Sequence, residues 1–315
     1  MTPVPVADPT PADHRPLDRL STFDLMFLRL EDVDQPCHFG GLAVLDGDPL
    51  RDADGSLRLA ELLAHLDART AQVPKLRQRV HSPGWLRGRP VWVDDAAFDV
   101  RNHVRTRPIA SPGGRDELLD AAASAYGELL DRRRPLWELW LLDGSPDGRV
   151  GALLKVHHAV ADGQAALTIM SALFDPTPDS HPEAHRPDHD TRTPSPIPRD
   201  RAQARDALAT RAQTVRRALS ALTRPRQMVR HARSLHRTAR GYVAHKGAPG
   251  SVLNRPVCAG RRVVHLTLDV PAAKGGAHAR GGTRNDVVLT LWAGGLRHLL
   301  TARGQPTTGL ALVTG

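Results

Sequence analysis

The spacing of hydrophobic residues divides the first half of the chain into helices and strands. Apolar positions three and four residues apart predict helices over Leu17 to Leu30, Leu57 to Thr70 and Asp116 to Leu130. Shorter apolar runs predict a strand over Phe39 to Leu45 and an extended segment over Phe98 to Arg105. The first half of the chain therefore contains both kinds of element.

Two strands joined by a tight turn precede the most informative motif. "WELWLLDG" alternates from Trp137, "SPDG" has Pro and Gly where a turn requires them, and "RVGALLKVHH" is the second strand. Together they predict an antiparallel hairpin. A helical pattern follows from Ala166 to Leu173. Asp162 is therefore expected at or near the N-cap of that helix, and Gly163 lets the backbone turn tightly after the strand.

Composition divides the whole chain into five segments. Residues 1–16 are a Pro-rich disordered leader without the basic and apolar regions of a signal peptide. A first domain covers 17–174, and a linker rich in Pro, Asp and His covers 175–200. Basic amphipathic helices cover 201–246, and 247–315 begins a second domain with a strand at "RRVVHLTLDV" and a helix at "TRNDVVLTLWAGGLRHLL". The linker histidines lack rigid flanking elements, so we predict no metal site there.

Positive charge is concentrated in the basic helices. The net charge is +9, and residues 199–246 alone hold thirteen Arg and Lys against two Asp. The arginines from Arg226 to Arg240 lie opposite the apolar residues from Met228 to Val243 on a helix. This pattern fits a solvated helix face or docking on an anionic membrane or lipid surface. No aromatic residues interleave with the arginines, so we expect no nucleic acid partner.

Cysteine content and hydropathy indicate the cellular compartment in which the protein is expected. Cys37 and Cys258 are the two cysteines and lie far apart, which predicts neither a disulfide framework nor a C-x-x-C metal site. The sequence has no run of about 18 apolar residues, the length that a membrane-spanning helix needs. We therefore expect a cytoplasmic protein, with the inner membrane face or lipid droplets as the surface for peripheral docking.

His157 and His158 end the second hairpin strand and are expected to lie on opposite faces of it. If the strand runs from Val150 to His158, alternation groups His158 with Val156 and His157 with Lys155. This argues against a metal centre that uses both rings. Desolvation beside an apolar face disfavours imidazolium, so His158 would be a neutral ring able to accept a proton. The alternative is a hydrogen-bonded packing histidine, the commoner role of a lone core histidine.

The pattern extends beyond the two histidines. His-His-x-x-x-Asp-Gly at a strand-to-helix corner resembles the motif of CoA-dependent acyltransferases with the chloramphenicol-acetyltransferase-like fold. From about Leu17 onward the chain also resembles the bacterial wax ester synthase/diacylglycerol acyltransferase family, in stretches that include "LSTFDLMFLRLE", "QPCHFGGLAVLDG", "PLWELWLLDG" and "NDVVLTLWAGGLRHLL". The resemblance implies an α/β fold with a mixed sheet, built as two similar domains with a channel between them.

The implied chemistry is acyl transfer without a covalent enzyme intermediate. By resemblance, His158 is the general base, His157 supports it, and Asp162 and Gly163 hold the corner. The implied partners are a long-chain acyl-CoA as co-substrate and diacylglycerol or a fatty alcohol as acceptor, with no bound cofactor and no metal. The product would be triacylglycerol or a wax ester.

Three further residues are candidates for the substrate channel. Glu138 is expected to organise the site, although it also fits an exposed strand position paired with Arg or Lys. Asn285 and Asp286 face the channel by resemblance. Thr283-x-x-Asp286 ahead of an apolar run is at the same time a helix capping pattern.

Two features depart from the family pattern. "PAAKGGAHARGGTR" has four glycines where family members resemble one another in a regular helix, so this element should be weak. Family members also continue beyond "LALVTG", which predicts a truncated second domain here. The alternatives to an active storage-lipid enzyme are a non-catalytic remnant that binds lipid surfaces and an acyltransferase for a hydroxylated secondary metabolite.

Overall fold

The computed structural model describes residues 17–84, 88–161, 163–174, 257–267 and 269–307, with three short pieces between 208 and 216. The predicted linker, most of the predicted basic helices and Asp162 lie outside these residues. The helices are α1 (Thr22–Leu30), α2 (Leu59–Thr70), α3 (Arg115–Gly127), α4 (Gly163–Leu173), α7 (Val270–His278) and α8 (Arg284–Ala302). The strands are β1 (His38–Leu45), β2 (Gln78–His81), β3 (Val91–Asp94), β4 (Val104–Pro108), β5 (Trp137–Asp143) and β6 (Val150–His157).

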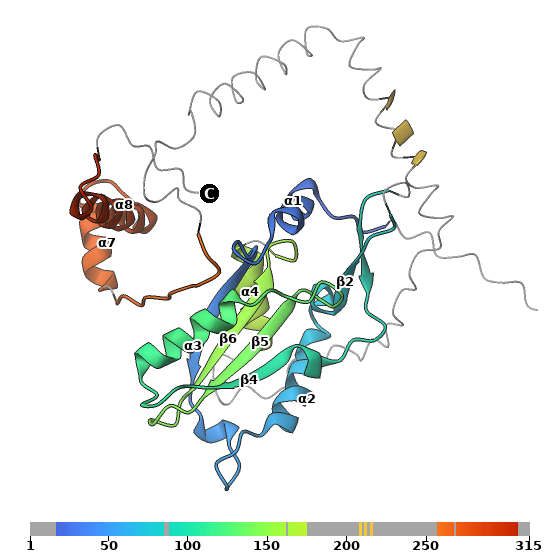
Figure 1. The fold of residues 1–315 in the computed structure, drawn as a ribbon, viewed down its shortest axis with the longest axis horizontal. Coiled ribbons are helices and arrows are strands. Elements are labelled where there is room, and N and C mark those ends of the chain that lie inside the picture. Colours follow the sequence, from blue (N-terminus) through green and yellow to red (C-terminus); the bar gives the residue numbers. More distant parts are fainter. Residues whose placement is uncertain are drawn as a thin grey trace, which may run out of the picture. The chain divides into compact units, whose positions relative to one another are not determined.

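A mixed four-stranded sheet is the centre of the first part of the chain (Figure 1). Its order is β1-β6-β5-β4, with β6 antiparallel to both neighbours and β4 parallel to β5. The predicted hairpin of β5 and β6 is confirmed. Its turn uses glycine at Gly144 (φ 114°) and Gly148 (φ 76°), where side chains with a Cβ are strained. Strands β2 and β3 form a separate antiparallel pair.

Helices cover both faces of the sheet, so every residue of β6 is buried. On one face Leu154 and Val156 pack in a core with Leu66 of α2 and Leu173 of α4. On the other face Leu153, Trp140 and Leu142 pack against alanines of α3. Burying one large aliphatic side chain contributes roughly 1.5–3 kcal/mol, so the two cores fix the sheet and the end of β6.

Several predicted boundaries shift for local reasons. Helix α1 begins at Thr22 and not at Leu17, because Ser21 and Asp24 form a capping box at its start. Within Phe98 to Arg105, a short 3₁₀ turn occupies Val100–Asn102, and strand β4 begins only at Val104. The α2 and α3 predictions are confirmed to within a few residues.

Contacts divide the chain into two compact units: Met1–Arg211 with Ala259–Val263, and Ala212–Cys258 with Val264–Gly315. The second unit contains α7 and α8. The predicted strand "RRVVHLTLDV" is wrong: residues 261–267 form no regular element, and Val270 already begins α7. A strand needs a neighbour to pair with, and the described residues provide none for this segment. Helix α7 continues through Gly275 and Gly276, and no described helix is long and apolar enough to cross a membrane.

Candidate functional site

His158 lies one residue beyond the strand that was predicted to contain it. Strand β6 ends at His157, and His158 opens the turn that leads toward α4. The backbone N–H of His158 donates to the carbonyl of Cys37, 3.0 Å away and just ahead of β1. This bond continues the pairing of β1 with β6 and fixes the backbone from which the ring projects.

Two phenylalanines hold the ring of His158. Phe27 of α1 stacks on it with centroids 4.9 Å apart, and Phe39 of β1 meets it edge-on at 5.3 Å. The residue is half-buried, and neither ring nitrogen has a hydrogen-bond partner among the described residues. Burial lowers the pKa of His158, and repulsion from His157 and His38 lowers it further. The ring is therefore neutral at neutral pH, and its nitrogen without a hydrogen can accept a proton.

His157 has a different environment and cannot share a ligand with His158. Its side chain is fully buried, and its Nδ1 accepts the backbone N–H of Ala159 at 2.9 Å. The hydrogen of a neutral ring then lies on Nε2, which is 3.6 Å from Oε1 of Glu31. His157 thus holds the turn that follows it.

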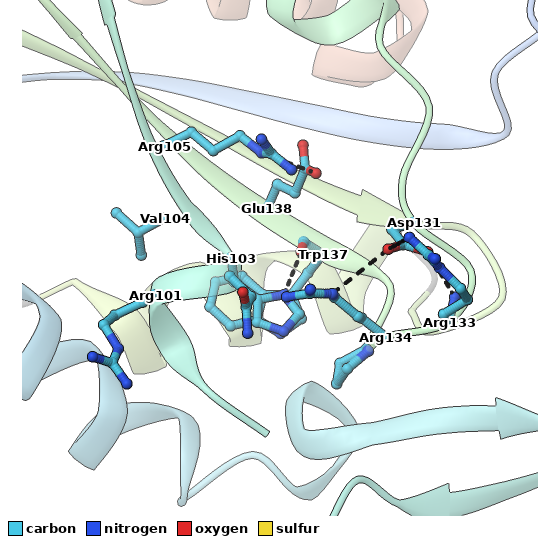
Figure 2. A pocket seen from close by; sticks show the side chains of 11 residues that line it. Arg101, His103, Val104, Arg105, Asp131, Arg133, Arg134, Trp137 and Glu138 are labelled. Atoms are coloured by element: carbon cyan, nitrogen blue, oxygen red, sulfur yellow. Dashed lines mark hydrogen bonds and ion pairs between the residues drawn. The ribbon is translucent and has the colours of Figure 1, made fainter. Parts of the chain in front are cut away.

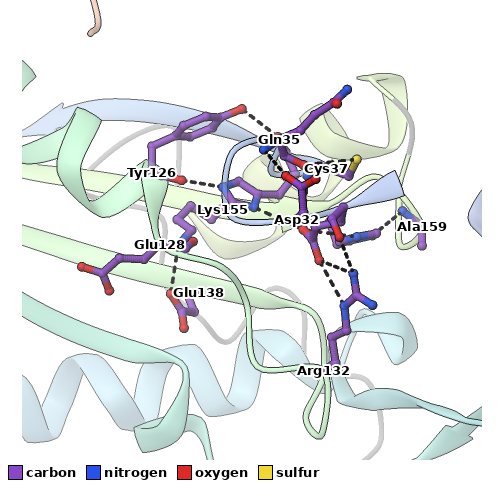
Figure 3. Close-up of polar contacts among 12 residues, drawn as sticks. Asp32, Gln35, Cys37, Tyr126, Glu128, Arg132, Glu138, Lys155 and Ala159 are labelled. Atoms are coloured by element: carbon purple, nitrogen blue, oxygen red, sulfur yellow. Dashed lines mark hydrogen bonds and ion pairs between the residues drawn. The ribbon is translucent and has the colours of Figure 1, made fainter. Parts of the chain in front are cut away.

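Glu31 has a buried carboxylate with several polar neighbours, of which Figure 3 labels Arg132 and Cys37. Its Oε2 pairs with Arg132 at 2.9 Å, and its Oε1 accepts the backbone N–H of Cys37 at 3.2 Å. Nδ1 of His38 lies 3.9 Å from Oε1. Burial raises the pKa of Glu31, but His157, His38 and Arg132 more than offset this and hold it well below its ordinary range. Glu31 is therefore ionised.

Glu138 of β5 is buried and faces Lys155 of β6, its register partner. Nζ of Lys155 donates to Glu138 at 3.2 Å and to the carbonyls of Ala125 and Glu128 at the end of α3. Glu138 also pairs with Arg105 at 3.3 Å. The alternative of an exposed strand position is wrong because α3 covers this face, and the expected organising role stays a prediction. The pairing with Lys and Arg is as expected.

A cavity of about 350 Å³ lies beside β4 and the start of β5 (Figure 2). Glu138, Trp137 and four arginines are among its lining residues, whereas His158 is not. His103 stacks on Trp137 at 4.6 Å, and its Nδ1 donates to the Trp137 carbonyl at 2.9 Å. The arginines pair with acidic neighbours, as Arg133 does with Asp131. The cavity is thus a polar hollow at the sheet edge, separate from the His158 ring.

The remaining predicted residues belong to other elements of the chain. Gly163 begins α4, whereas Asp162 lies outside the described residues. Asn285 is exposed in the first turn of α8, in the second unit. Asp286 completes the predicted capping box: its carboxylate accepts from the backbone N–H of Thr283 at 2.7 Å. The structure thus brings together His157 and His158 from the predicted set, and Glu138 lies nearby on the neighbouring strand.

The residues that surround the histidines were not among those predicted from the sequence. Phe27 and Glu31 come from "LSTFDLMFLRLE", and His38 and Phe39 from "QPCHFGGLAVLDG". Both stretches carried the family resemblance, but no local pattern gives their residues a role. The contacts of Glu31 with His157 and of Phe27 with His158 join parts of the chain that are more than 100 residues apart in sequence.

The described fold places a neutral histidine at a strand-to-helix corner of a mixed α/β sheet, an arrangement suited to proton transfer. Residues 20–288 match the model of the wax ester synthase/diacylglycerol acyltransferase catalytic domain. The chain belongs to this family.

Individual relatives support the same family assignment. The chain is 34% identical over 257 residues to tgs3 of Mycobacterium tuberculosis, named a probable diacylglycerol O-acyltransferase, covering 80% of this chain and 93% of that protein. It is 31% identical over 302 residues to Rv1760 of the same species, named provisionally for the same activity, covering 95% of this chain but 58% of Rv1760. The chain thus spans little more than half the length of that relative.

A solved structure shows the same fold. The wax ester synthase/diacylglycerol acyltransferase from Marinobacter aquaeolei VT8 matches with a TM-score of 0.59 and 26% identity, over 91% of this chain and 61% of that one. The mixed α/β acyltransferase fold implied by the sequence is confirmed.

Proposed function

We propose that the protein is an O-acyltransferase that uses a long-chain acyl-CoA and forms storage lipid. The acceptor would be diacylglycerol, giving triacylglycerol, or a fatty alcohol, giving a wax ester. Family membership supports the reaction class, and the names of the relatives favour diacylglycerol. The observation that carries the proposal is the neutral His158 ring, held between Phe27 and Phe39 with its nitrogens unpaired among the described residues.

His158 would act as the general base. A ring nitrogen takes the proton of the acceptor hydroxyl while the oxygen attacks the thioester carbonyl carbon. The tetrahedral intermediate collapses by breaking the C–S bond, and the imidazolium of His158 returns the proton to the departing CoA thiolate. Atoms and charge balance without an enzyme-bound acyl group, and no cofactor takes part.

The other predicted residues would have supporting roles. His157 fixes the turn through Ala159, and Glu138 neutralises the buried Lys155 that lies under the end of α3. The phenylalanines would exclude water from the side of the ring that they cover. Both acceptors are water-insoluble, so we place the reaction at a lipid surface, either the inner membrane face or a droplet.

Product analysis tests the proposal. The full chain is incubated with palmitoyl-CoA and either 1,2-diacylglycerol or hexadecanol, and products are measured by mass spectrometry. His158→Ala should lower the rate about 10²- to 10⁴-fold. The control His265→Ala removes an exposed histidine of the second unit and should leave the rate unchanged. Wild-type turnover in His158→Ala would refute the role of the base, and absence of both products with the wild-type chain would refute the substrate class.

A further inference from the structure

Glu31 is a buried, ionised carboxylate that the proposed reaction does not use. Its side chain is 1% exposed, although it sits at the C-cap of α1 where most side chains reach solvent. Burying a carboxylate is costly unless its partners are well placed. The partners of Glu31 come from β1, β6 and the loop before β5. The side chain therefore connects three segments that are separate in the sequence, which is more than a helix cap requires.

Two paths run from Glu31 to the backbone around His158, one made of hydrogen bonds and one that includes a longer polar contact with His157. In the first, Oε1 accepts the N–H of Cys37 at 3.2 Å, and the carbonyl of Cys37 accepts the N–H of His158 at 3.0 Å. In the second, Oε1 faces Nε2 of His157 at 3.6 Å, and Nδ1 of His157 accepts the N–H of Ala159 at 2.9 Å. Glu31 is therefore linked to the peptide group before His158 by hydrogen bonds through Cys37, and it lies next to the His157 ring that bonds the peptide group after His158.

A third connection reaches the His158 ring itself. The backbone N–H of Glu31 donates to the carbonyl of Phe27 at 3.1 Å, in the last turn of α1. The ring of Phe27 stacks on the ring of His158 with an interplanar angle of 23°. The ion pair of Glu31 with Arg132 ties this end of α1 to the loop that leads into β5. Anchoring Glu31 thus fixes both the backbone and the ring of His158.

We propose that Glu31 is a positioning residue that fixes the orientation of the His158 ring. This rests on the proposed function, in which His158 is the base. Glu31 makes no contact with His158 and acts through Cys37, His157 and Phe27. A residue that only stabilised the fold would change the fraction of folded protein but leave the ring geometry and kcat of the folded molecules as they were.

The test uses the full chain with Glu31→Ala and Glu31→Gln. Glu31→Ala removes both side-chain paths, whereas the amide oxygen of Glu31→Gln can still accept the Cys37 N–H. We expect kcat to fall about 100-fold in Glu31→Ala, the scale of a misplaced reacting group, with KM for acyl-CoA within about twofold. Glu31→Gln should recover part of the loss. Glu61→Ala is the matched control, because it removes an exposed carboxylate of α2 that pairs with Arg58.

Ring-current shifts give a readout that does not need activity. Protons of the His158 ring lie against Phe27 and Phe39, so their NMR shifts report the stacking geometry. These shifts should move toward unstacked values in Glu31→Ala and stay unchanged in Glu61→Ala. If Glu31→Ala does not fold, the NMR shifts of the His158 ring protons are measured in Glu31→Gln.

The outcomes separate the two proposals. Unchanged ring shifts and unchanged kcat in a folded Glu31 variant would overturn the positioning role. If the wild-type chain transfers no acyl group but the ring shifts still change in the Glu31 variant, the proposed function fails and the positioning of His158 by Glu31 stands.

Discussion

Replacing Lys155 by methionine should destabilise the first unit strongly while leaving its shape intact. The ammonium of Lys155 is completely buried and contacts Glu138 and the carbonyls of Ala125 and Glu128. Methionine fills a similar volume but donates no hydrogen bond. Burial lowers the pKa of Lys155 despite the attraction of Glu138, which shows that keeping this charge inside already has a cost.

The size of the effect follows from the buried polar groups that lose a partner in the variant. Glu138 loses its closest cation and keeps Arg105, whose side chain is 49% exposed, and the indole N–H of Trp140. Two carbonyls at the end of α3 lose their donor. Removing one partner of a buried ion pair typically costs about 3–5 kcal/mol. Since Arg105 offsets part of this, we expect Lys155→Met to lower the free energy of unfolding by about 3 kcal/mol.

Urea denaturation of four proteins, followed by tryptophan fluorescence, measures the effect as a double-mutant cycle. Glu138→Gln removes the carboxylate charge but keeps an acceptor for Trp140, so the double variant Lys155→Met/Glu138→Gln should recover about 1–2 kcal/mol relative to additive losses. The control pair Lys75 and Asp18 is partly exposed and should contribute less than about 1 kcal/mol. A loss below about 1 kcal/mol for Lys155→Met, or no coupling with Glu138, would refute this reasoning.

Two predictions concern pH. The pKa of His158 lies below its ordinary value of 6.5, so the ring stays neutral down to at least that pH. We therefore expect kcat/KM, measured against pH, to fall only below about pH 6.5. A fall that begins above pH 7 would contradict the burial argument. Because the pKa of Glu31 lies well below its ordinary value of 4.5, the unfolded chain binds the proton first as pH falls, so this group stabilises the fold above pH 4.5 and loses that contribution below it. Glu31→Gln should flatten the acid slope of the unfolding free energy by about 1.4 kcal/mol per pH unit, and equal slopes in chemical denaturation would contradict the ionised buried carboxylate.

Elements that depend on neighbours in sequence could be predicted from the chain alone. The hairpin of β5 and β6 follows from alternation around a Pro and Gly turn, and α8 begins where Thr283 and Asp286 predict its cap. The family could also be identified from its motifs. In each case the residues that carry the pattern lie close together in sequence, so local interactions determine the structure that forms.

Features set by distant contacts could not be predicted. Strand β6 ends at His157 because the His157 ring takes the N–H of Ala159 and turns the chain, which alternation alone does not show. Glu138 is buried because α3 lies over it. Glu31 follows the last residue of an amphipathic helix, where the sequence pattern alone indicates a solvated carboxylate. Its partners, however, lie as far along the chain as residue 157.

Chemical rescue of His158→Ala tests the central claim most directly. CoA release from palmitoyl-CoA is followed with 1,2-diacylglycerol as acceptor, for the wild-type chain and the variant, with and without added imidazole. We expect acceptor-dependent release by the wild type, loss of about 10²- to 10⁴-fold in the variant, and partial recovery with imidazole, which supplies the missing base. Release by the variant at the wild-type rate, without imidazole, would contradict this expectation.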